Sequence, residues 1–351
     1  MRKKYCLKIT FSLFVLIPFL LLAFSNPTIA AGKPMILKFA HPIPGPVSSA
    51  AGWYWWAKEL EKQTNGRIKI EFYPGGTLFK IEPALDSITS GVADIGMISL
   101  GVTENRLPLL SVTGLPLLGF PDTVEGNYAA GQALLDLHEK FPEVQAECKD
   151  FKLLLPQFTS NHNLVCKNKV VRVPSDIKGL KVGGTGKKAA LIDSLGGASI
   201  AVSPPDSYMS IDKAVLDAVF LGWSHSRIYK IQEVAKVFLD YGFSQSGIPV
   251  IMNLKSWGKI SPADQKIMMG LTKEGRKRSS AANMKGVMGG RKLAEDAGAT
   301  IITLTPEERK LWEKAAEPIW NAWINDMNKR GLNSADKVLA AWKQMRDEAL
   351  K

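Results

Sequence analysis

Two runs of alternating strand and helix patterns constrain the fold of this chain more than any other feature. In the first run, strand patterns at 35–40, 68–72 and 94–98 alternate with helix patterns at 53–63 and 81–90. A strand that follows a helix usually pairs in parallel with the strand before it, because the helix carries the chain back across the sheet. The first run therefore predicts a mostly parallel sheet that is covered by helices.

A second run of the same kind begins near residue 158. Strand and helix patterns alternate there over 179–182, 187–195, 198–202, 208–213 and 217–221. The chain has 351 residues, and single hydrophobic cores stop growing beyond ~250 residues. The two runs therefore predict an α/β fold with two lobes, in which each lobe is a mostly parallel sheet flanked by helices.

The last third of the chain is predicted to be largely helical. Ser261-Pro262 and Thr305-Pro306 each place a hydroxyl side chain before a proline, and an acid stands three residues after the hydroxyl. Such a residue can cap the first turn of a helix, and proline suits the first helical position. In the second of these helices the large apolar side chains share one face and indicate packing rather than a cofactor site: Trp312, Trp320, Trp323 and Met327.

The first thirty residues have the parts of a signal peptide. Four basic residues precede an apolar run over 11–24, and the small residues Thr28 and Ala30 follow it. We expect cleavage after Ala30 and export to the periplasm. A membrane anchor is the alternative, but the run of ~14 residues is shorter than the ~20 that cross a bilayer.

Composition and charge exclude several classes of protein. Hydrophobic residues make up 46% and charged residues 22% of the chain, which is typical of a globular protein and not of a disordered one. The formal net charge is +12, but basic and acidic residues alternate along the helices and form no stripe with aromatic residues. We therefore expect no nucleic-acid partner. A solvated surface explains the charge most simply, and attraction to anionic lipids or acidic partners is the alternative.

Beyond the predicted signal peptide the chain has two cysteines, Cys148 and Cys166. A disulfide between them and two buried free thiols are both compatible with the sequence. The chain has no CxxC or HExxH spacing, and its four histidines are scattered. We therefore expect no metal and no cofactor.

One Gly-rich turn bears on enzymatic function. Gly184-Thr185-Gly186, with Ala189 and Asp206 after it, has the outline of a dinucleotide fingerprint. A secreted nicotinamide-dependent oxidoreductase is therefore an alternative, although the preceding strand is short; the turn could also hold an anion at a helix N-terminus. An exported two-lobed α/β chain without a catalytic signature is most simply a solute-binding protein, with its ligand in the cleft between lobes. A surface or scaffolding protein is a third interpretation.

Five segments resemble those of a known family. They read IKIEFYPGGTL at 68–78, SGVADIGMI at 90–98, VPSDIKGLKV at 173–182, DSYMSIDKAVLDAVFLGW at 206–223 and KIQEV at 230–234. Together they resemble the periplasmic solute receptors of tripartite ATP-independent periplasmic (TRAP) transporters, of the dicarboxylate-receptor type. The resemblance extends from about Leu37 to Trp342.

This resemblance implies a receptor rather than an enzyme. Such a receptor binds a small organic solute, here expected to be an organic acid, and delivers it to the membrane permease subunits of a TRAP transporter. It also implies a monomer whose two lobes close on the ligand about a hinge. Lobe I would span 31–157 and about 246–285, and lobe II would span 158–245 and about 286–351.

The chain departs from the family pattern at the ligand. An arginine after the strand at 179–182 usually binds the substrate carboxylate in the family, and Gly183 stands there in this chain. The often basic position twenty residues earlier is Asn163. We expect the glycine to leave room for a solute larger and more apolar than a C4 dicarboxylate, with aromatic and branched acids as candidates. The charge of such an acid would be met by Lys187, Asn163 or the amides of 184–186. A neutral or cationic ligand is equally compatible with Gly183.

Eight residues are candidates for ligand contact. They stand near strand ends or in the crossover between the lobes, and Trp223 is the strongest candidate. Structural alternatives are open for five of them. Tyr208 could only hold its lobe together, His41 could only satisfy loop backbone, and Lys187 could be a solvated first-turn lysine. Ser99 and Phe158 are equally open to a structural role. The candidates are His41, Ser99, Phe158, Asn163, Gly183, Lys187, Tyr208 and Trp223.

Overall fold

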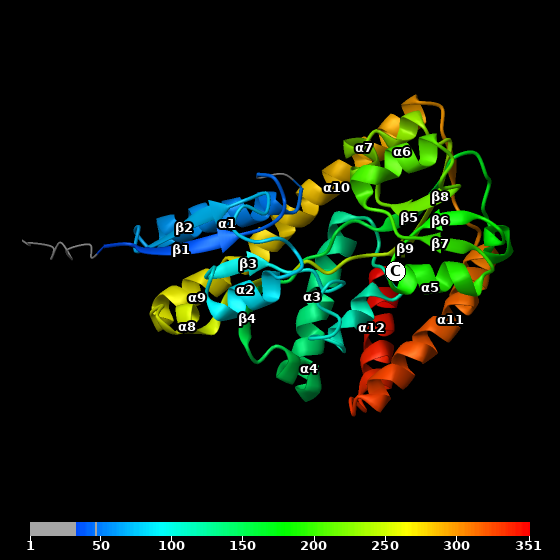
Figure 1. The fold of residues 1–351 in the computed structure, drawn as a ribbon. Helices are drawn as coiled ribbons and strands as arrows, with labels where there is room; N and C mark the ends of the chain where they lie inside the picture. The colour runs from blue at the N-terminus through cyan, green and yellow to red at the C-terminus, as the bar shows by residue number, and fades with distance from the viewer. Residues whose placement is uncertain (1–32, 46–47) are drawn as a thin grey trace, which may run out of the picture. The chain divides into compact units, whose positions relative to one another are not determined.

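Two separate β-sheets organise the computed structural model, which describes residues 33–45 and 48–351 (Figure 1). The predicted signal peptide at 1–30 and its cleavage after Ala30 lie outside the described residues. In the first sheet β1 pairs in parallel with β2 and β3, whereas β10 runs antiparallel to β3 and β4. Its strands, in spatial order, are β2 (Ile68–Tyr73), β1 (Met35–Ala40), β3 (Ile95–Met97), β10 (Val250–Asn253) and β4 (Phe151–Leu155).

The second sheet also has a single reversed strand. β5 runs antiparallel to β9 and β8, whereas β11 with β9, β8 with β6 and β6 with β7 are parallel pairs. Its strands, in spatial order, are β11 (Thr300–Ile302), β9 (Val237–Ser244), β5 (His162–Cys166), β8 (Ala218–Leu221), β6 (Lys181–Gly183) and β7 (Ala198–Ile200). The predicted mostly parallel sheets are confirmed.

The reversed strands are the ones that the chain enters on crossing between the sheets. It leaves the first sheet after β4 and enters β5 through 156–161, and it returns from β9 to β10 through 245–249. No helix intervenes at either crossing, so the chain is not carried back across the sheet, and each entering strand runs against its neighbours.

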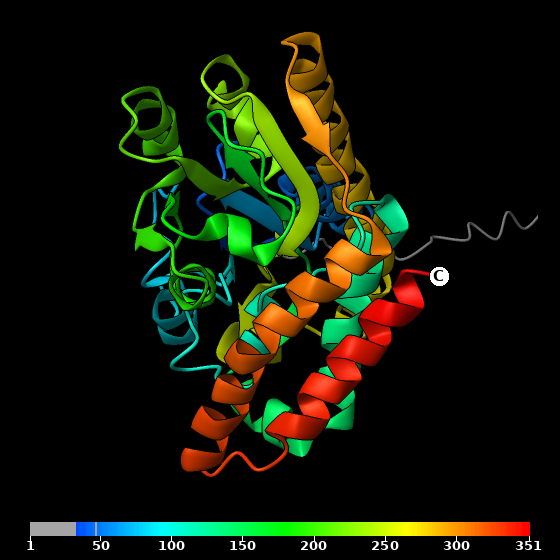
Figure 2. The ribbon, with the colours of Figure 1, turned by 90° about the vertical axis from the view of Figure 1, so that its right-hand side faces the viewer.

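Helices flank the sheets (Figures 1 and 2). The predicted helix starts are confirmed to within a few residues, although the second helix begins at Ala84 rather than 81, because Pro83 takes the capping position. The helices are α1 (Ala50–Gln63), α2 (Ala84–Ser90), α3 (Val124–Lys140), α4 (Pro142–Glu147), α5 (Lys187–Ser194), α6 (Ser207–Asp212), α7 (Trp223–Ile228), α8 (Leu254–Gly258), α9 (Pro262–Gly270), α10 (Thr272–Asp296), α11 (Pro306–Lys329) and α12 (Ala335–Ala349).

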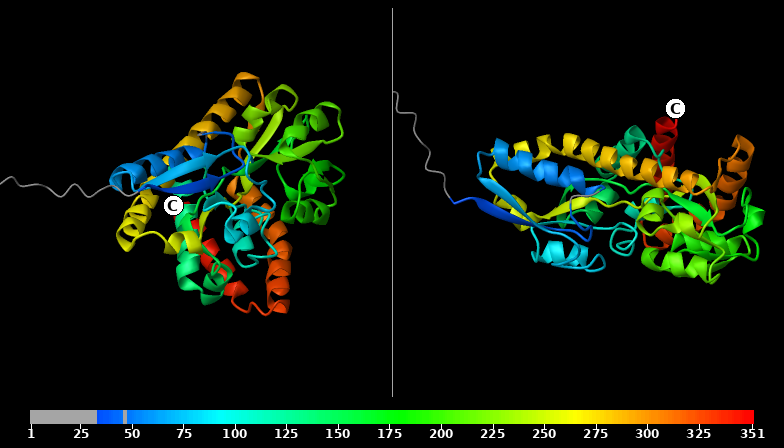
Figure 3. Two further views of the ribbon diagram at one scale, coloured as in Figure 1. Left: turned by 60° about the vertical axis from the view of Figure 1, so that its left-hand side comes forward. Right: turned by 90° about the horizontal axis from the view of Figure 1, so that it is seen from above.

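The long helix α10 packs against elements of both sheets (Figure 3, right). It contacts α1, which lies on the first sheet, and α7, which follows β8 of the second sheet. Glycines permit both contacts: a Cβ at Gly52 of α1 would lie 2.1 Å from the carbonyl oxygen of Gly275, and a Cβ at Gly290 would lie 2.1 Å from the carbonyl oxygen of Trp223. Helix α10 is thus a third connection between the two halves of the fold, beside the two crossings.

The C-terminal helices bury the aromatic face that the sequence predicts. The predicted cap of α11 is confirmed: the Thr305 hydroxyl accepts a hydrogen bond from the Glu308 amide at 3.2 Å, and the Glu308 carboxylate accepts one from the Thr305 amide at 2.8 Å. The indole N–H groups of Trp320 and Trp342 donate to the carbonyl oxygens of Pro116 and Leu118.

These contacts join residues predicted for lobe II to a segment predicted for lobe I. Helix α12 also packs against α3, which lies in the predicted lobe I. The assignment of 31–157 and 246–285 to one lobe, and of 158–245 and 286–351 to the other, stays a prediction.

The sequence allows either a disulfide or two free thiols, and the structure has two free thiols. Cys148 and Cys166 are buried and unpaired, and burial raises the pKa of each thiol to about 12. Within the part of the chain that the structure describes, no helix is both long enough and apolar enough to cross a membrane.

Candidate ligand-binding cavity

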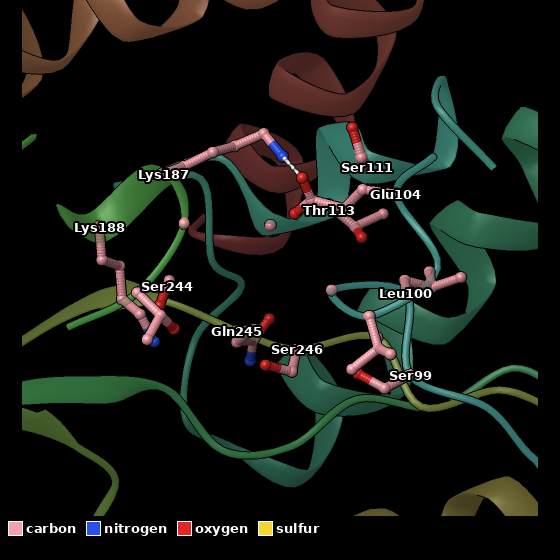
Figure 4. Close-up of a pocket in the computed structure, with 16 residues that line it drawn as sticks. Ser99, Leu100, Glu104, Ser111, Thr113, Lys187, Lys188, Ser244, Gln245 and Ser246 are labelled. Atoms are coloured by element: carbon pink, nitrogen blue, oxygen red, sulfur yellow. Dashed lines mark ion pairs between the residues drawn. The ribbon is translucent and has the colours of Figure 1, made fainter. Parts of the chain in front are cut away.

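A cavity of about 380 Å³ lies where segments from both sheets meet (Figure 4). Its lining comes from four places: the loop after β3 at 99–104, the short 3-10 helix around 111–114, the first turn of α5 with the residues before it at 185–188, and the β9–β10 crossing at 244–247. Each of these segments follows or precedes a strand or helix end, where backbone direction changes and polar side chains can reach the cavity.

The lining is mainly polar. Among the lining residues that the structure describes there is no aromatic side chain, and six carry a hydroxyl group: Ser99, Ser111, Thr113, Thr185, Ser244 and Ser246. The charged residues are Lys187, Lys188 and Glu104. The cavity therefore offers hydrogen-bonding groups and positive charge to a small polar ligand.

An ion pair crosses the cavity. The Nζ atom of Lys187, at the start of α5, lies 2.7 Å from Oε2 of Glu104 in the loop after β3 (Figure 4). The Lys187 side chain is only 15% exposed. Each of the two side chains thus neutralises the other inside the lining.

The second lysine of the lining has different neighbours. The Nζ atom of Lys188 lies 3.0 Å from Nδ1 of His162, and the same Nδ1 lies 3.2 Å from Oγ of Ser244. Because an ammonium group only donates hydrogen bonds, the His162 Nδ1 is an acceptor and the ring is neutral. Burial, and then the charges of Lys188 and His225, hold the pKa of His162 well below its ordinary value.

The environment also perturbs the other two groups of this cluster. Burial lowers the pKa of Lys188 to about 8, so most of its amine is protonated at neutral pH. Burial and the Lys188 charge lower the pKa of His225, whose ring centroid lies 6.5 Å from that of His162. The cluster therefore carries one positive charge on Lys188 beside two neutral imidazoles.

Two of the eight sequence candidates line the cavity, Ser99 and Lys187. A third, Phe158, is fully buried directly behind it: its backbone pairs with Gly247 of the lining, and its ring edge would lie 3.3 Å from a Cβ at that glycine. Asn163 is buried one residue after His162, where its Oδ1 accepts a hydrogen bond from the amide of Gly242 at 3.2 Å.

The expected room at Gly183 is absent, and this expectation is wrong. A Cβ at this position would lie 2.7 Å from Val202, 2.8 Å from Val219 and 3.0 Å from Leu216. The side-chain direction at Gly183 therefore points into the apolar packing of the second sheet and not into open space.

Trp223 and Tyr208 lie outside the lining. The Trp223 indole is buried and stacks on Phe238 with ring centroids 5.0 Å apart, and its N–H donates to Asp240 at 3.0 Å. Tyr208 packs against the same apolar cluster, and its hydroxyl donates to Glu233. The contacts of both side chains stabilise the second half of the fold. For Tyr208 this is the structural role that the sequence also allows.

His41 lies in an aromatic cluster next to the first sheet. Its ring makes edge contacts with Phe39, Trp53, Tyr54 and Phe72. Burial lowers its pKa to about 4. These contacts give the ring a packing role beside the first sheet, which is not the role in satisfying loop backbone that the sequence left open for this histidine.

Sequence reasoning missed Lys188, Glu104 and Ser244. Lys188 follows a predicted residue in the first turn of a helix, so its neighbour was a usable signal. Glu104 and Ser244 carried no sequence signal, because both meet their partners only in the folded chain. Ser244 is 82 residues from His162 and meets it through the pairing of β5 with β9. Glu104 meets Lys187, which belongs to a distant segment. Among the described residues, no group of three or more His, Cys, Asp or Glu side chains is placed to hold a metal ion.

The architecture and the cavity define a class, the two-sheet α/β proteins with a polar cavity where segments of both sheets meet. The family model of the bacterial extracellular solute-binding proteins, family 7, matches residues 46–326. The chain belongs to this family, which confirms the resemblance drawn from the sequence. It is accordingly a solute receptor and not an enzyme, and the comparisons give no support to the oxidoreductase alternative.

Individual relatives agree with the family match. The chain is 25% identical over 304 residues to the C4-dicarboxylate-binding periplasmic protein DctP of Rhodobacter capsulatus, a match that covers 85% of this chain and 88% of that protein. It is 22% identical over 307 residues to a solute-binding protein of Albidiferax ferrireducens, over 84% of this chain and 88% of the relative.

Solved structures confirm the fold. A TRAP periplasmic solute-binding protein from Desulfovibrio salexigens superposes with a TM-score of 0.80 at 24% identity, over 90% of this chain and 97% of that one. A marine metagenome TRAP solute-binding protein specific for aromatic acid ligands, in complex with 3-hydroxybenzoate, gives 0.78 at 25% identity, over 91% and 100% of the two chains.

Proposed function

We propose that this protein is a periplasmic receptor that binds an organic acid in the cavity at 99–104, 111–114, 185–188 and 244–247, and delivers it to a TRAP-type permease. The observation that carries the proposal is that one polar cavity with two lysines is lined by segments from both sheets, beside the two chain crossings. Solutes of family receptors bind between halves that can close on them.

The relatives support an organic acid as the solute. The ligands of relatives and structural neighbours include C4-dicarboxylates, 3-hydroxybenzoate, mandelate and glucuronate, and every one of these carries at least one carboxylate. The aromatic or branched acid expected from the sequence belongs to this range. Its proposed stacking on Trp223 and Phe158 has no support, because neither ring is part of the lining.

Thermal unfolding with a panel of acids tests the proposal. A ligand raises the free energy of unfolding by RT ln(1 + [L]/Kd), which is about 2.7 kcal/mol at a hundred times Kd. We expect a saturable rise with at least one carboxylic acid and none with NAD⁺ or NADP⁺. A rise with the nucleotide alone would contradict receptor function, and mass spectrometry of the protein purified from its host would identify a retained solute.

Three further features belong to the proposal. Export would leave a mature chain that begins at or near Ala31, which N-terminal sequencing of protein from the host envelope tests. The receptor would act as a monomer, which light scattering on the eluted protein tests. Hinge closure through 156–161 and 245–249 would reduce the radius of gyration on ligand binding, and an unchanged small-angle scattering profile at saturation would contradict it.

A further inference from the structure

We propose that Lys188 supplies the one unneutralised positive charge of the cavity, and that this receptor therefore prefers monocarboxylates to dicarboxylates. The inference rests on the proposed function, because it assumes that the ligand is an organic acid bound in this cavity. It differs from the sequence expectation, in which Lys187, Asn163 and the backbone amides of 184–186 were the candidates for binding the carboxylate.

The position of Lys188 is the first step. Its side chain lines the cavity and lies beside Ser244 (Figure 4). Its Nζ donates to the neutral Nδ1 of His162 at 3.0 Å, which leaves ammonium hydrogens without a partner in the cluster. Among the described residues no carboxylate lies within 4.0 Å of this amine.

The missing counter-charge is the second step. An ammonium that is largely withdrawn from water is unfavourable unless a negative group pairs with it, and Lys188 is half-buried. The groups that face Lys188 do not provide that charge, because His162 and His225 are neutral. A carboxylate in the cavity would provide it.

The charge of the rest of the lining is the third step. Lys187 is paired with Glu104 at 2.7 Å, so this pair adds no net charge. The three charged lining residues together therefore carry one positive charge, that of Lys188. One carboxylate balances it, whereas the second carboxylate of a dianion would compete with Glu104 for Lys187 and would add an unbalanced negative charge.

The neutral part of the lining suits the rest of such a ligand. Hydroxyl side chains from all four lining segments, among them Ser99, Thr113 and Ser246, line the cavity together with the two lysines. These groups can both donate to and accept from ligand hydroxyl groups. The hydroxyl groups of a hydroxylated monocarboxylate can pair with these side chains. The second carboxylate of a C4 diacid would find hydroxyl groups there but no free cation.

Calorimetric titration tests the charge preference. The wild-type protein would be titrated with glucuronate and mandelate as monocarboxylates, with succinate as the dicarboxylate, and with mandelamide as an uncharged analogue. We expect at least one of the monocarboxylates to bind at least about tenfold more tightly than succinate, and mandelamide not to bind. Succinate binding as tight as that of both monocarboxylates, or amide binding equal to acid binding, would overturn the inference.

Substitution of the lysine tests the residue. Lys188→Met should weaken binding of the preferred acid about 100-fold, because it removes the cation of a charge pair that the ligand would complete inside the cavity. Lys181→Met, which removes an exposed lysine on β6, is the matched control and should bind like the wild type. Lys188→Arg keeps the charge and should retain more binding than the methionine variant.

Stability without ligand separates loss of binding from loss of folding. Lys188→Met should unfold at the same temperature as the wild type or at a higher one, since it removes an unpaired, half-buried charge. A folded Lys188→Met that binds the acid within threefold of wild type would overturn the inference while receptor function stands. Failure of every acid to bind the wild type would instead refute the proposed function itself.

Discussion

The Lys187 ammonium and the Glu104 carboxylate meet at 2.7 Å across the cavity. Lys187 begins α5 beside the second sheet, and Glu104 belongs to the loop after β3 of the first sheet. The pair thus joins the two halves of the fold at the proposed ligand site, and it neutralises one of the two lysines there. The charge available to a ligand depends on this contact.

Removal of the Glu104 charge should change ligand preference. Glu104→Gln frees the charge of Lys187, so the lining would carry two positive charges instead of one. We expect the affinity for succinate to rise about tenfold relative to that for a monocarboxylate. Calorimetry measures both affinities. The control is Asp86→Asn, which breaks an exposed ion pair with Arg106 outside the cavity and should leave the ratio unchanged. An unchanged ratio in Glu104→Gln would contradict the charge balance.

Ligand affinity should fall in alkaline solution. The pKa of Lys188 is about 8, and a bound carboxylate favours the protonated amine, so binding is strongest below this pH. Above it, Kd should rise by up to about tenfold per pH unit. The facing histidines His162 and His225 do not interfere, because their lowered pKa values keep them neutral across this range.

The Lys188→Arg variant provides the comparison for this pH dependence. Arginine keeps its charge throughout the accessible range. Its Kd should therefore stay flat between pH 7 and pH 10, where that of the wild type rises. A wild-type Kd that is equally flat would show that no lysine with a lowered pKa binds the ligand.

Asp122 should make the protein less stable as the pH rises. Burial raises its pKa to about 7 from an ordinary value of 3.8, and the charge of Asp240 adds to the shift. The folded state therefore holds a proton that the unfolded state releases, and its stabilising effect is lost between about pH 4 and pH 7. Asp122 accepts a hydrogen bond from the Asn161 amide at 2.9 Å, within the crossing at 156–161.

An amide at this position removes the titration and keeps the acceptor oxygen. We expect Asp122→Asn to raise the free energy of unfolding at pH 8 by on the order of 1–3 kcal/mol, and to change it little at pH 4. Denaturant unfolding at the two values measures the difference. His41 titrates with the opposite sign at acid pH in both proteins, because its pKa is lowered, and it cancels in the comparison. Equal effects of the substitution at both pH values would argue against a raised Asp122 pKa.

The contact between α10 and Trp223 should not tolerate a methyl group. A Cβ at Gly290 would lie 2.1 Å from the Trp223 carbonyl oxygen, which is backbone and cannot move aside. We expect Gly290→Ala to cost about 1–3 kcal/mol or more of stability, the range measured for overpacked cores. At the neighbouring Gly289 the nearest atom is the flexible end of Arg227 at 2.9 Å.

Gly289→Ala is thus the matched control within one helix. Alanine favours a helix over glycine by about 1 kcal/mol, so this variant should be as stable as the wild type or more stable. Thermal unfolding of the two variants compares them directly. A Gly290→Ala protein as stable as Gly289→Ala would mean that α10 and α7 are further apart than the structure has them.

Much of the fold was predictable because local patterns determine it. Alternating strand and helix patterns over 35–98 and 179–221 predicted two mostly parallel sheets, and the Thr305 cap predicted the start of α11. The family resemblance was predictable for the same reason, since its segments are continuous stretches of sequence. The direction of β5 and β10 was not, because it depends on how the chain crosses between sheets.

The candidate site was predictable only in part. Ser99 and Lys187 line the cavity because they stand at the end of a strand and the start of a helix, which the patterns locate. Trp223 stands at an equivalent place but is buried, since Gly290 lets α10 pack closely over α7 and Phe238 stacks on its indole. Whether a residue at the end of an element faces solvent or core depends on what packs against it.

The sequence by itself determined the class of fold, its helix caps and the family, because these depend on the period of apolar residues and on short motifs. Only the tertiary structure decided which charges meet. It brings Glu104 to Lys187, and His162 with Ser244 to Lys188, from segments far apart in the chain. Electrostatic interactions act over a few ångströms in space, irrespective of separation along the chain. The net charge offered to a ligand is therefore a property of the folded cavity, and no local pattern contains it.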